Sequence, residues 1–356
     1  MKSSSRGACI AVLIAVAATT AVAQVPADLA AKLREIGTVV CVPETAKLYA
    51  PLQQHAPYKG VTIVRDIPYA SDPRTLMDVF APEKGGGNRP VLIYVSGGGG
   101  DKKVNGPDGD AFYDNIMLWA VKNGMTGVNM QRRGGLGGGG QAWDEPAKDV
   151  GRVVEWVRAH IKMYKGNPNR IFLWADSAGN GPVSTFAAHP EIHGANGLAV
   201  KGIVLMSPPN FNILPETVAG PARGTPDTSG RGALSTTCGR PAGEARGGAG
   251  AGRGGAGGGG GRGGAAAPVD DATQLARSNL PGLAKGKIQV FLGWGEIDSA
   301  NIWVFDEGLK NALCKAGRCP TSAVFKDHSH VSLVFSPNTA DDSVTGPILK
   351  WMKSVK

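Results

Sequence analysis

Long apolar segments are scarce in this chain of 356 residues, and only one stands out. The run Ala8–Ala23 is short for a membrane span, and no later segment is long and apolar enough to cross a bilayer. Lys2 and Arg6 precede the run, and the small residues of "AVAQ" (Ala21–Gln24) end it, which is typical of a secretory signal peptide. We therefore predict a signal peptide over residues 1–23 and a secreted or periplasmic mature chain without a membrane span. A retained N-terminal anchor is the competing interpretation.

Cysteine is also scarce, and its spacing resembles no common zinc pattern. Cys9 lies in the predicted signal peptide, which leaves Cys41, Cys238, Cys314 and Cys319. An even number of cysteines in an exported chain is compatible with disulfides. The stretch "CKAGRC" would close a small loop, so we favour a Cys314–Cys319 bond, and Cys41 could pair with Cys238 by elimination only.

Acidic charge is in deficit, because the formal net charge is +9. Lys2 and Arg6 carry two of these charges and residues 221–267 carry a net four, so only three remain on the rest of the chain. No basic helix or aromatic-studded strand face stands out. We therefore expect no nucleic-acid partner.

Apolar strands and amphipathic helices alternate from residue 61 onward, which favours an α/β fold with a mostly parallel sheet covered on both faces. About eight strands are expected, at residues 61–70, 76–82, 89–95, 125–133, 169–176, 200–208, 287–295 and 322–327. Helices are expected at residues 27–37, 112–124, 144–164, 181–189, 302–317 and 342–355. The predicted organisation is an N-terminal arm over residues 24–60 followed by one α/β domain over residues 61–356.

A segment at about residues 210–280, after the sixth strand, has little periodicity. Its centre, Ala245–Ala267, consists almost entirely of Gly, Ala and Arg and has too few apolar side chains to offset the entropy of ordering. We predict a disordered, Gly/Arg-rich insertion. Arg-Gly repeats can bind RNA when disordered, but an exported chain rarely meets RNA.

The stretch "WADSAGN" (Trp174–Asn180) places Ser177 where an apolar strand meets a helix. A serine in such a turn is presented with its hydroxyl exposed, as in the G-x-S-x-G motif of serine hydrolases. Here Ala175 replaces the first glycine, while Gly179 keeps the second. Both positions are crowded and require small residues, so one extra methyl group is tolerable. We predict that Ser177 is a nucleophile rather than an ordinary serine at a helix start.

A serine nucleophile needs a base, an acid and donors for the developing oxyanion. The loop "SGGGG" (Ser96–Gly100) ends the third strand and could supply backbone N–H groups, although it could also be a plain flexible turn. Asp298 follows the seventh strand as the candidate acid, with Glu296 as its nearest rival, and either could instead be a helix cap.

The stretch "FKDHSHVS" after the last strand supplies two candidate bases, His328 and His330. A metal-binding H-x-H pair is the competing interpretation, but no third ligand is evident. If this segment stays extended, both side chains point the same way, and alternation cannot choose between them. His330 lies farther beyond the strand, so it is the better candidate.

The order Ser, Asp, His is typical of the α/β-hydrolase fold. The chain resembles the exported esterase/lipase branch that includes hormone-sensitive-lipase-like and feruloyl-esterase-like carboxylesterases. The resemblance covers roughly residues 61–352 apart from the insertion, and it rests on "LIYVSGGGG", "NPNRIFLWADSAGN", "GWGEIDS" and "HSHVS". It implies that His330 is the base and that the N–H groups of Gly98, Gly99 and Ala178 form the oxyanion hole.

Three departures from that family stand out. Ser96 replaces the histidine of the H-G-G-G loop, which braces the loop in the family. Ala175 replaces the glycine before the nucleophile, and Gly134–Gly140 follows "NMQRR" where a Tyr-Arg-Leu segment is usual. None of these changes removes a catalytic group.

The predicted function is hydrolysis of small-molecule carboxylic esters through an acyl-enzyme, with the triad Ser177, Asp298 and His330 and no metal or organic cofactor. Two alternatives stay open, an amidase or peptidase with the same triad and a catalytically silent binding protein with this fold. In this fold the cap that shapes the acyl pocket commonly follows the sixth strand, where this chain has its Gly/Arg-rich insertion.

Overall fold

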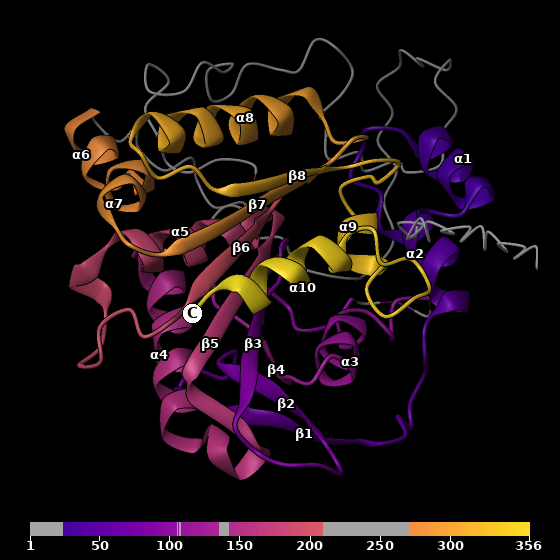
Figure 1. Ribbon diagram of the computed structural model, residues 1–356, viewed down its shortest axis with the longest axis horizontal. Coiled ribbons are helices and arrows are strands. Elements are labelled where there is room, and N and C mark those ends of the chain that lie inside the picture. The colour runs from indigo at the N-terminus through magenta and orange to yellow at the C-terminus, as the bar shows by residue number, and fades with distance from the viewer. Residues whose placement is uncertain (1–23, 105, 107, 135–141, 209–270) are drawn as a thin grey trace, which may run out of the picture.

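A computed structural model describes residues 24–104, 106, 108–134, 142–208 and 271–356 (Figure 1). Eight strands form one sheet in the order β1-β2-β4-β3-β5-β6-β7-β8. β2 pairs antiparallel with both β1 and β4, and all other neighbours pair in parallel. The strands are β1 (Val61–Pro68), β2 (Leu76–Pro82), β3 (Arg89–Val95), β4 (Thr126–Met130), β5 (Gly166–Asp176), β6 (Gly202–Met206), β7 (Gln289–Gly295) and β8 (Thr321–Phe325). The predicted mostly parallel sheet of about eight strands is confirmed.

Helices cover both faces of the sheet. One face is covered by α1 (Ala27–Ile36), α2 (Val42–Tyr49), α3 (Asp114–Lys122), α9 (Ser332–Phe335) and α10 (Thr345–Ser354), of which α10 crosses in front of the strands in Figure 1. The other face is covered by α4 (Glu145–His160), α5 (Asn180–Ala188), α7 (Asn279–Lys285) and α8 (Ala300–Lys315). α6 (Asp271–Ala276) precedes α7.

The side-chain alternation of the central strands explains the two cores. In β5, Phe172 and Trp174 face the core that contains α3 and α10, while Ile171, Leu173 and Ala175 face the core that contains α4 and α5. Successive strand residues point to opposite faces, so a strand buried on both sides is apolar throughout. The uninterrupted apolar runs in the sequence are therefore the central strands.

Several predictions about the helices need correction. The helix α2 in the N-terminal arm was not predicted, and the helix expected from residue 112 begins at Asp114. The aperiodic segment ends earlier than about residue 280, because α6 and α7 occupy residues 271–285. These two helices are short and separated by a turn, so periodicity could not identify them. The predicted disorder at Ala245–Ala267 lies outside the described residues.

The predicted Cys314–Cys319 disulfide is confirmed, and it joins the end of α8 to the approach of β8. Cys41 is buried next to α2, and Cys238 lies outside the described residues. In the part of the chain that the structure describes, no helix has the length and apolar character needed to cross a membrane.

Candidate active site

Ser177 occupies a sharp turn between β5 and α5. Its φ is 47°, a left-handed conformation that residues with a side chain rarely adopt. The chain then passes through a short 3₁₀ turn, Ser177–Gly179, into α5. Such a strained strand–turn–helix junction is typical of a nucleophilic serine.

The two small residues around Ser177 meet different demands. A Cβ at Gly179 would lie 2.2 Å from the carbonyl oxygen of Val95 and 2.7 Å from that of Ser96, so this position requires glycine. Ala175 is fully buried within β5, and its methyl group packs in the core on the α4 side. Ala175 therefore replaces the first glycine of the G-x-S-x-G motif at a position where a methyl group has room.

The glycine loop after β3 lies against Ser177. A Cβ at Gly97 would lie 2.8 Å from the Cβ of Ser177, and the Gly97 N–H donates to Oδ1 of Asp176 at 3.0 Å. Within the described residues, the N–H groups of Gly98 and Gly99 donate no hydrogen bond. The N–H of Ala178 belongs to the first helical turn, where no preceding turn supplies an acceptor. Three donors predicted for an oxyanion hole thus remain available for a ligand.

Asp298 and His330 form a buried pair beyond the ends of β7 and β8. Oδ1 of Asp298 lies 2.7 Å from Nδ1 of His330, and the two residues are 4% and 8% exposed. Oδ2 of Asp298 accepts from the Ser207 hydroxyl at 2.5 Å and from the Gly295 N–H at 2.8 Å. The carboxylate is held by three partners, so it fixes the orientation of the imidazole.

Charges around His330 favour its protonated form. Burial lowers the pKa of His330, but the charge of Asp298, its hydrogen bond and the charge of Asp176 together raise that pKa above its ordinary value. Asp176 directly precedes Ser177 in the chain. Ser177, Asp298 and His330 follow β5, β7 and β8, and the carboxyl ends of parallel strands share one edge of a sheet.

The rival acid and the rival histidine have other partners. Glu296 lies 3.4 Å from Arg34 and accepts from the N–H of Asp327, so it faces the N-terminal helix rather than His330. His328 is fully buried, with Nδ1 3.0 Å from the Ser332 hydroxyl and Nε2 2.9 Å from the Ser343 hydroxyl.

The extended conformation considered for this segment is wrong. The residues after Phe325 form turns, and Asp327 has a φ of 62°. His328 and His330 therefore enter different polar clusters. Among the described residues, no group of three or more His, Cys, Asp or Glu side chains could hold a metal ion.

Three residues that support the site were not predicted. Asn180 is fully buried and donates to the carbonyl oxygens of Ser177 at 2.8 Å and Met206 at 2.7 Å, which ties the nucleophile turn to the end of β6. Ser207 has a φ of 46° and holds Asp298 as described above. Tyr94 donates to Asp176 at 2.5 Å. Asn180 ends the quoted stretch "WADSAGN" and Ser207 lies in the strand predicted over residues 200–208, so their position in the sequence is the only signal that could have identified them.

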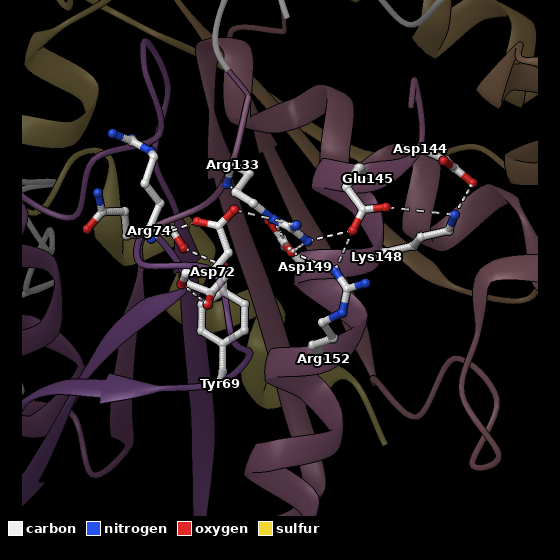
Figure 2. Close-up of polar contacts among 11 residues, drawn as sticks. Tyr69, Asp72, Arg74, Arg133, Asp144, Glu145, Lys148, Asp149 and Arg152 are labelled. Carbon is white, nitrogen blue, oxygen red and sulfur yellow. Dashed lines mark hydrogen bonds and ion pairs between the residues drawn. The ribbon is translucent and has the colours of Figure 1, made fainter. Parts of the chain in front are cut away.

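An ionic network anchors the segment after β4 next to this site. Arg133 lies 2.6 Å from Asp149 and 2.5 Å from Glu145, and Arg152 contacts the same two carboxylates at 2.7 and 2.9 Å. Figure 2 shows Arg133 reaching between Asp72 and the first turns of α4. Acidic side chains at a helix N-terminus are favourable, so the network holds both the helix start and the chain that leaves β4.

Comparisons with known proteins agree with this architecture. A family model described as BD-FAE matches residues 77–193. Phenmedipham hydrolase of Pseudarthrobacter oxydans is 27% identical over 256 residues, which cover 69% of this chain and 49% of that protein. The chain spans about half or less of the length of the characterised relatives that it matches.

Solved structures match over most of the chain. Esterase B from Lactobacillus rhamnosis has a TM-score of 0.59 at 15% identity, over 87% of this chain and 91% of that one. An esterase from the bacterial hormone-sensitive lipase family has a TM-score of 0.54 at 15% identity, over 92% and 97%. At these identities the similarity concerns the fold.

Proposed function

We propose that this chain, which belongs to the α/β-hydrolase superfamily, hydrolyses carboxylic esters of small molecules through an acyl-enzyme intermediate. The observation that carries the proposal is the buried Asp298–His330 pair, which lies at the same sheet edge as the strained Ser177 turn. Esterases and lipases among the matching proteins support the substrate class.

In the proposed mechanism, His330 acts as the general base. Its Nδ1 donates to Asp298, so Nε2 is the basic nitrogen and takes the proton of Ser177 as the hydroxyl oxygen attacks the ester carbonyl. Asp298 stabilises the imidazolium that forms. His330 then returns the proton to the leaving alcohol, and a water molecule hydrolyses the acyl-enzyme by the same steps in reverse.

The carbonyl oxygen becomes negatively charged in the tetrahedral intermediate. The N–H groups of Gly98, Gly99 and Ala178 are the proposed donors to it, because none of them is used within the described protein. A backbone donor of this kind is fixed before the reaction, so it needs no rearrangement in the transition state.

The test is hydrolysis of p-nitrophenyl acetate and butyrate by the purified protein, with Ser177→Ala as the control. Loss of the nucleophile should reduce kcat by roughly 10⁴–10⁶-fold. A Ser177→Ala variant that keeps a tenth of the wild-type rate would show that another residue is the nucleophile. Turnover of the matching p-nitroanilides at a comparable rate would indicate an amidase, and no turnover of either class would indicate a binding protein.

We also propose that the protein is exported, on the basis of the predicted signal peptide over residues 1–23, which lies outside the described residues. The Cys314–Cys319 disulfide is compatible with an oxidising compartment. N-terminal sequencing of protein recovered from the periplasm or medium should give Gln24 as the first residue, and a mature protein that begins at Met1 would contradict this.

A further inference from the structure

The glycine loop after β3 runs from Ser96 to Gly100, and Ser96 is the only residue of this loop with a side chain. The Ser96 hydroxyl donates to the carbonyl oxygen of Asp101, the residue directly after the loop, at 2.6 Å. A serine hydroxyl that closes its own loop cannot connect the loop to the rest of the protein. Another group must therefore hold the loop in place.

Arg132 is that group. It follows β4, is only 3% exposed, and lies under the loop. Its Nε and Nη2 lie 3.3 and 3.2 Å from the carbonyl oxygen of Ser96, and Nη2 lies 3.2 Å from that of Gly98. Its backbone N–H donates to the carbonyl oxygen of Gly100 at 2.9 Å. One residue thus contacts three of the five carbonyl groups from Ser96 to Gly100.

The other two carbonyl groups of the loop also accept hydrogen bonds. That of Gly97 accepts from the Gly100 N–H at 3.0 Å, and that of Gly99 accepts from Arg74 at 3.3 Å. All five carbonyl oxygens therefore have donors, while the N–H groups of Gly98 and Gly99 have no acceptor among the described residues. The loop presents donors without competing acceptors, which suits an anion.

Peptide geometry connects the hydrogen-bonded carbonyl groups of the loop with its unused N–H groups. A trans peptide is planar, so its C=O and the following N–H point in opposite directions. Arg132 draws the Ser96 carbonyl to one side, and the Gly97 N–H accordingly points away and reaches Asp176 at 3.0 Å. Arg132 also contacts the Gly98 carbonyl, so the Gly99 N–H points away from Arg132. The guanidinium thus sets the direction of a predicted oxyanion donor.

Burial lowers the pKa of Arg132, and the charges of Asp176 and Asp101 raise it, but neither carboxylate contacts the guanidinium. Among the described residues, no carboxylate lies within ion-pair distance of it, and its side-chain hydrogen bonds all go to backbone carbonyls. Burial of a cation without a paired anion is costly. The loop accommodates this side chain closely, because Gly100 has a φ of +83° and a Cβ there would lie 2.5 Å from Cγ of Arg132.

We propose that Arg132 is a positioning residue for the oxyanion hole, which orients the Gly98–Gly99 peptide and keeps a positive charge behind it during ester hydrolysis. This inference rests on the proposed function. It predicts a loss of transition-state stabilisation rather than of substrate binding, because the guanidinium contacts the loop and not the ester.

The test compares Arg132→Met and Arg132→Lys with Arg158→Met as a matched control. Arg158 also donates to a backbone carbonyl, that of Pro168 at 3.3 Å, but it lies in the last turn of α4, at the opposite end of the sheet. Each variant is assayed for kcat and KM with p-nitrophenyl butyrate, for inhibition by butylboronic acid, which forms a tetrahedral adduct with a nucleophilic serine, and for melting temperature.

In Arg132→Met we expect kcat and boronate affinity to fall by about 10²–10³-fold, the effect of losing one oxyanion donor, with a much smaller change in KM. The kcat and boronate affinity of Arg132→Lys should lie between those of Arg132→Met and the wild type, because lysine keeps the charge but lacks the planar guanidinium that contacts two carbonyl groups. Arg158→Met should lower the melting temperature without lowering kcat. If Arg132→Met fails to fold, the lysine variant carries the same comparison.

Three outcomes would overturn the proposal. They are an unchanged kcat in Arg132→Met, an unchanged boronate affinity in Arg132→Met, and a loss of kcat in Arg158→Met as large as that in Arg132→Met. A wild-type protein without turnover and without boronate binding would instead refute the proposed function.

Discussion

The contrast between Gly179 and Ala175 allows a direct test of the nucleophile turn. A Cβ added at Gly179 would lie 2.2 Å from the Val95 carbonyl oxygen, whereas ordinary contacts begin at 3.4 Å. The backbone segments at Gly179 and Val95 must therefore separate by about 1.2 Å. Both sides of this contact are backbone, and neither can yield by a change of rotamer. The separation must therefore move the Ser177 turn, the glycine loop or both.

The expected cost of Gly179→Ala is about 1–3 kcal/mol of stability from overpacking. A misplacement of about 1 Å can reduce the rate about 10²-fold, and we expect a fall in kcat of that order with p-nitrophenyl butyrate. Ala175→Gly is the matched control. It loses one buried methyl group and gains backbone freedom, at a combined cost of about 1–2 kcal/mol, but it introduces no clash.

The two variants should therefore be similar in stability and different in kcat. Denaturant unfolding and steady-state kinetics on the same preparations measure both quantities. The steric explanation would be refuted if Gly179→Ala kept wild-type kcat, or if Ala175→Gly lost as much activity as Gly179→Ala.

Three further predictions concern titratable side chains. His330→Ala should reduce kcat as fully as Ser177→Ala. His328→Ala should lose stability and keep measurable turnover, because His328 bonds to the hydroxyl groups of two serines and not to Asp298. The reverse ranking in kinetics near pH 8 would exchange the two roles. Because Asp298 helps to raise the pKa of His330 against the effect of burial, kcat/KM should increase with pH through a midpoint above the ordinary histidine value of about 6.5. Asp298→Asn should move that midpoint to lower pH, and an unmoved midpoint would exclude His330 as the titrating base. Asp306 is fully buried with both carboxylate oxygens unpaired, and burial together with Asp298 raises its pKa well above the usual value. In the folded protein Asp306 retains a proton that it releases in the unfolded state, so the free energy of unfolding falls as pH rises above about 4. Asp306→Leu should raise the free energy of unfolding by about 1–3 kcal/mol, and denaturant unfolding at pH 5 and pH 8 should show a larger gain at the higher pH.

The sequence alone predicted the architecture and proposed all three members of the candidate triad. The apolar runs of β3, β5 and β6 and the stripe on α4 reflect local periodicities, and these depend only on neighbouring residues. Ser177 and Asp298 directly follow strands, so a linear motif marks them. The short helices α2, α6, α7 and α9 escaped prediction because each has fewer than nine residues and gains its stability from packing.

The sequence favoured His330 over His328, but the different partners of the two histidines came from the tertiary structure, because a tight turn at Asp327 sends the two side chains into different surroundings. The supporting contacts are also long-range. Ser207 and Asp298 are 91 residues apart, and Arg132 and Ser96 are 36 apart. No periodicity or motif in the sequence indicates which acceptor a hydroxyl group or a guanidinium will contact. Only the folded sheet, which brings the ends of β3, β4, β6 and β7 to one edge, decides which carbonyl or carboxylate it meets.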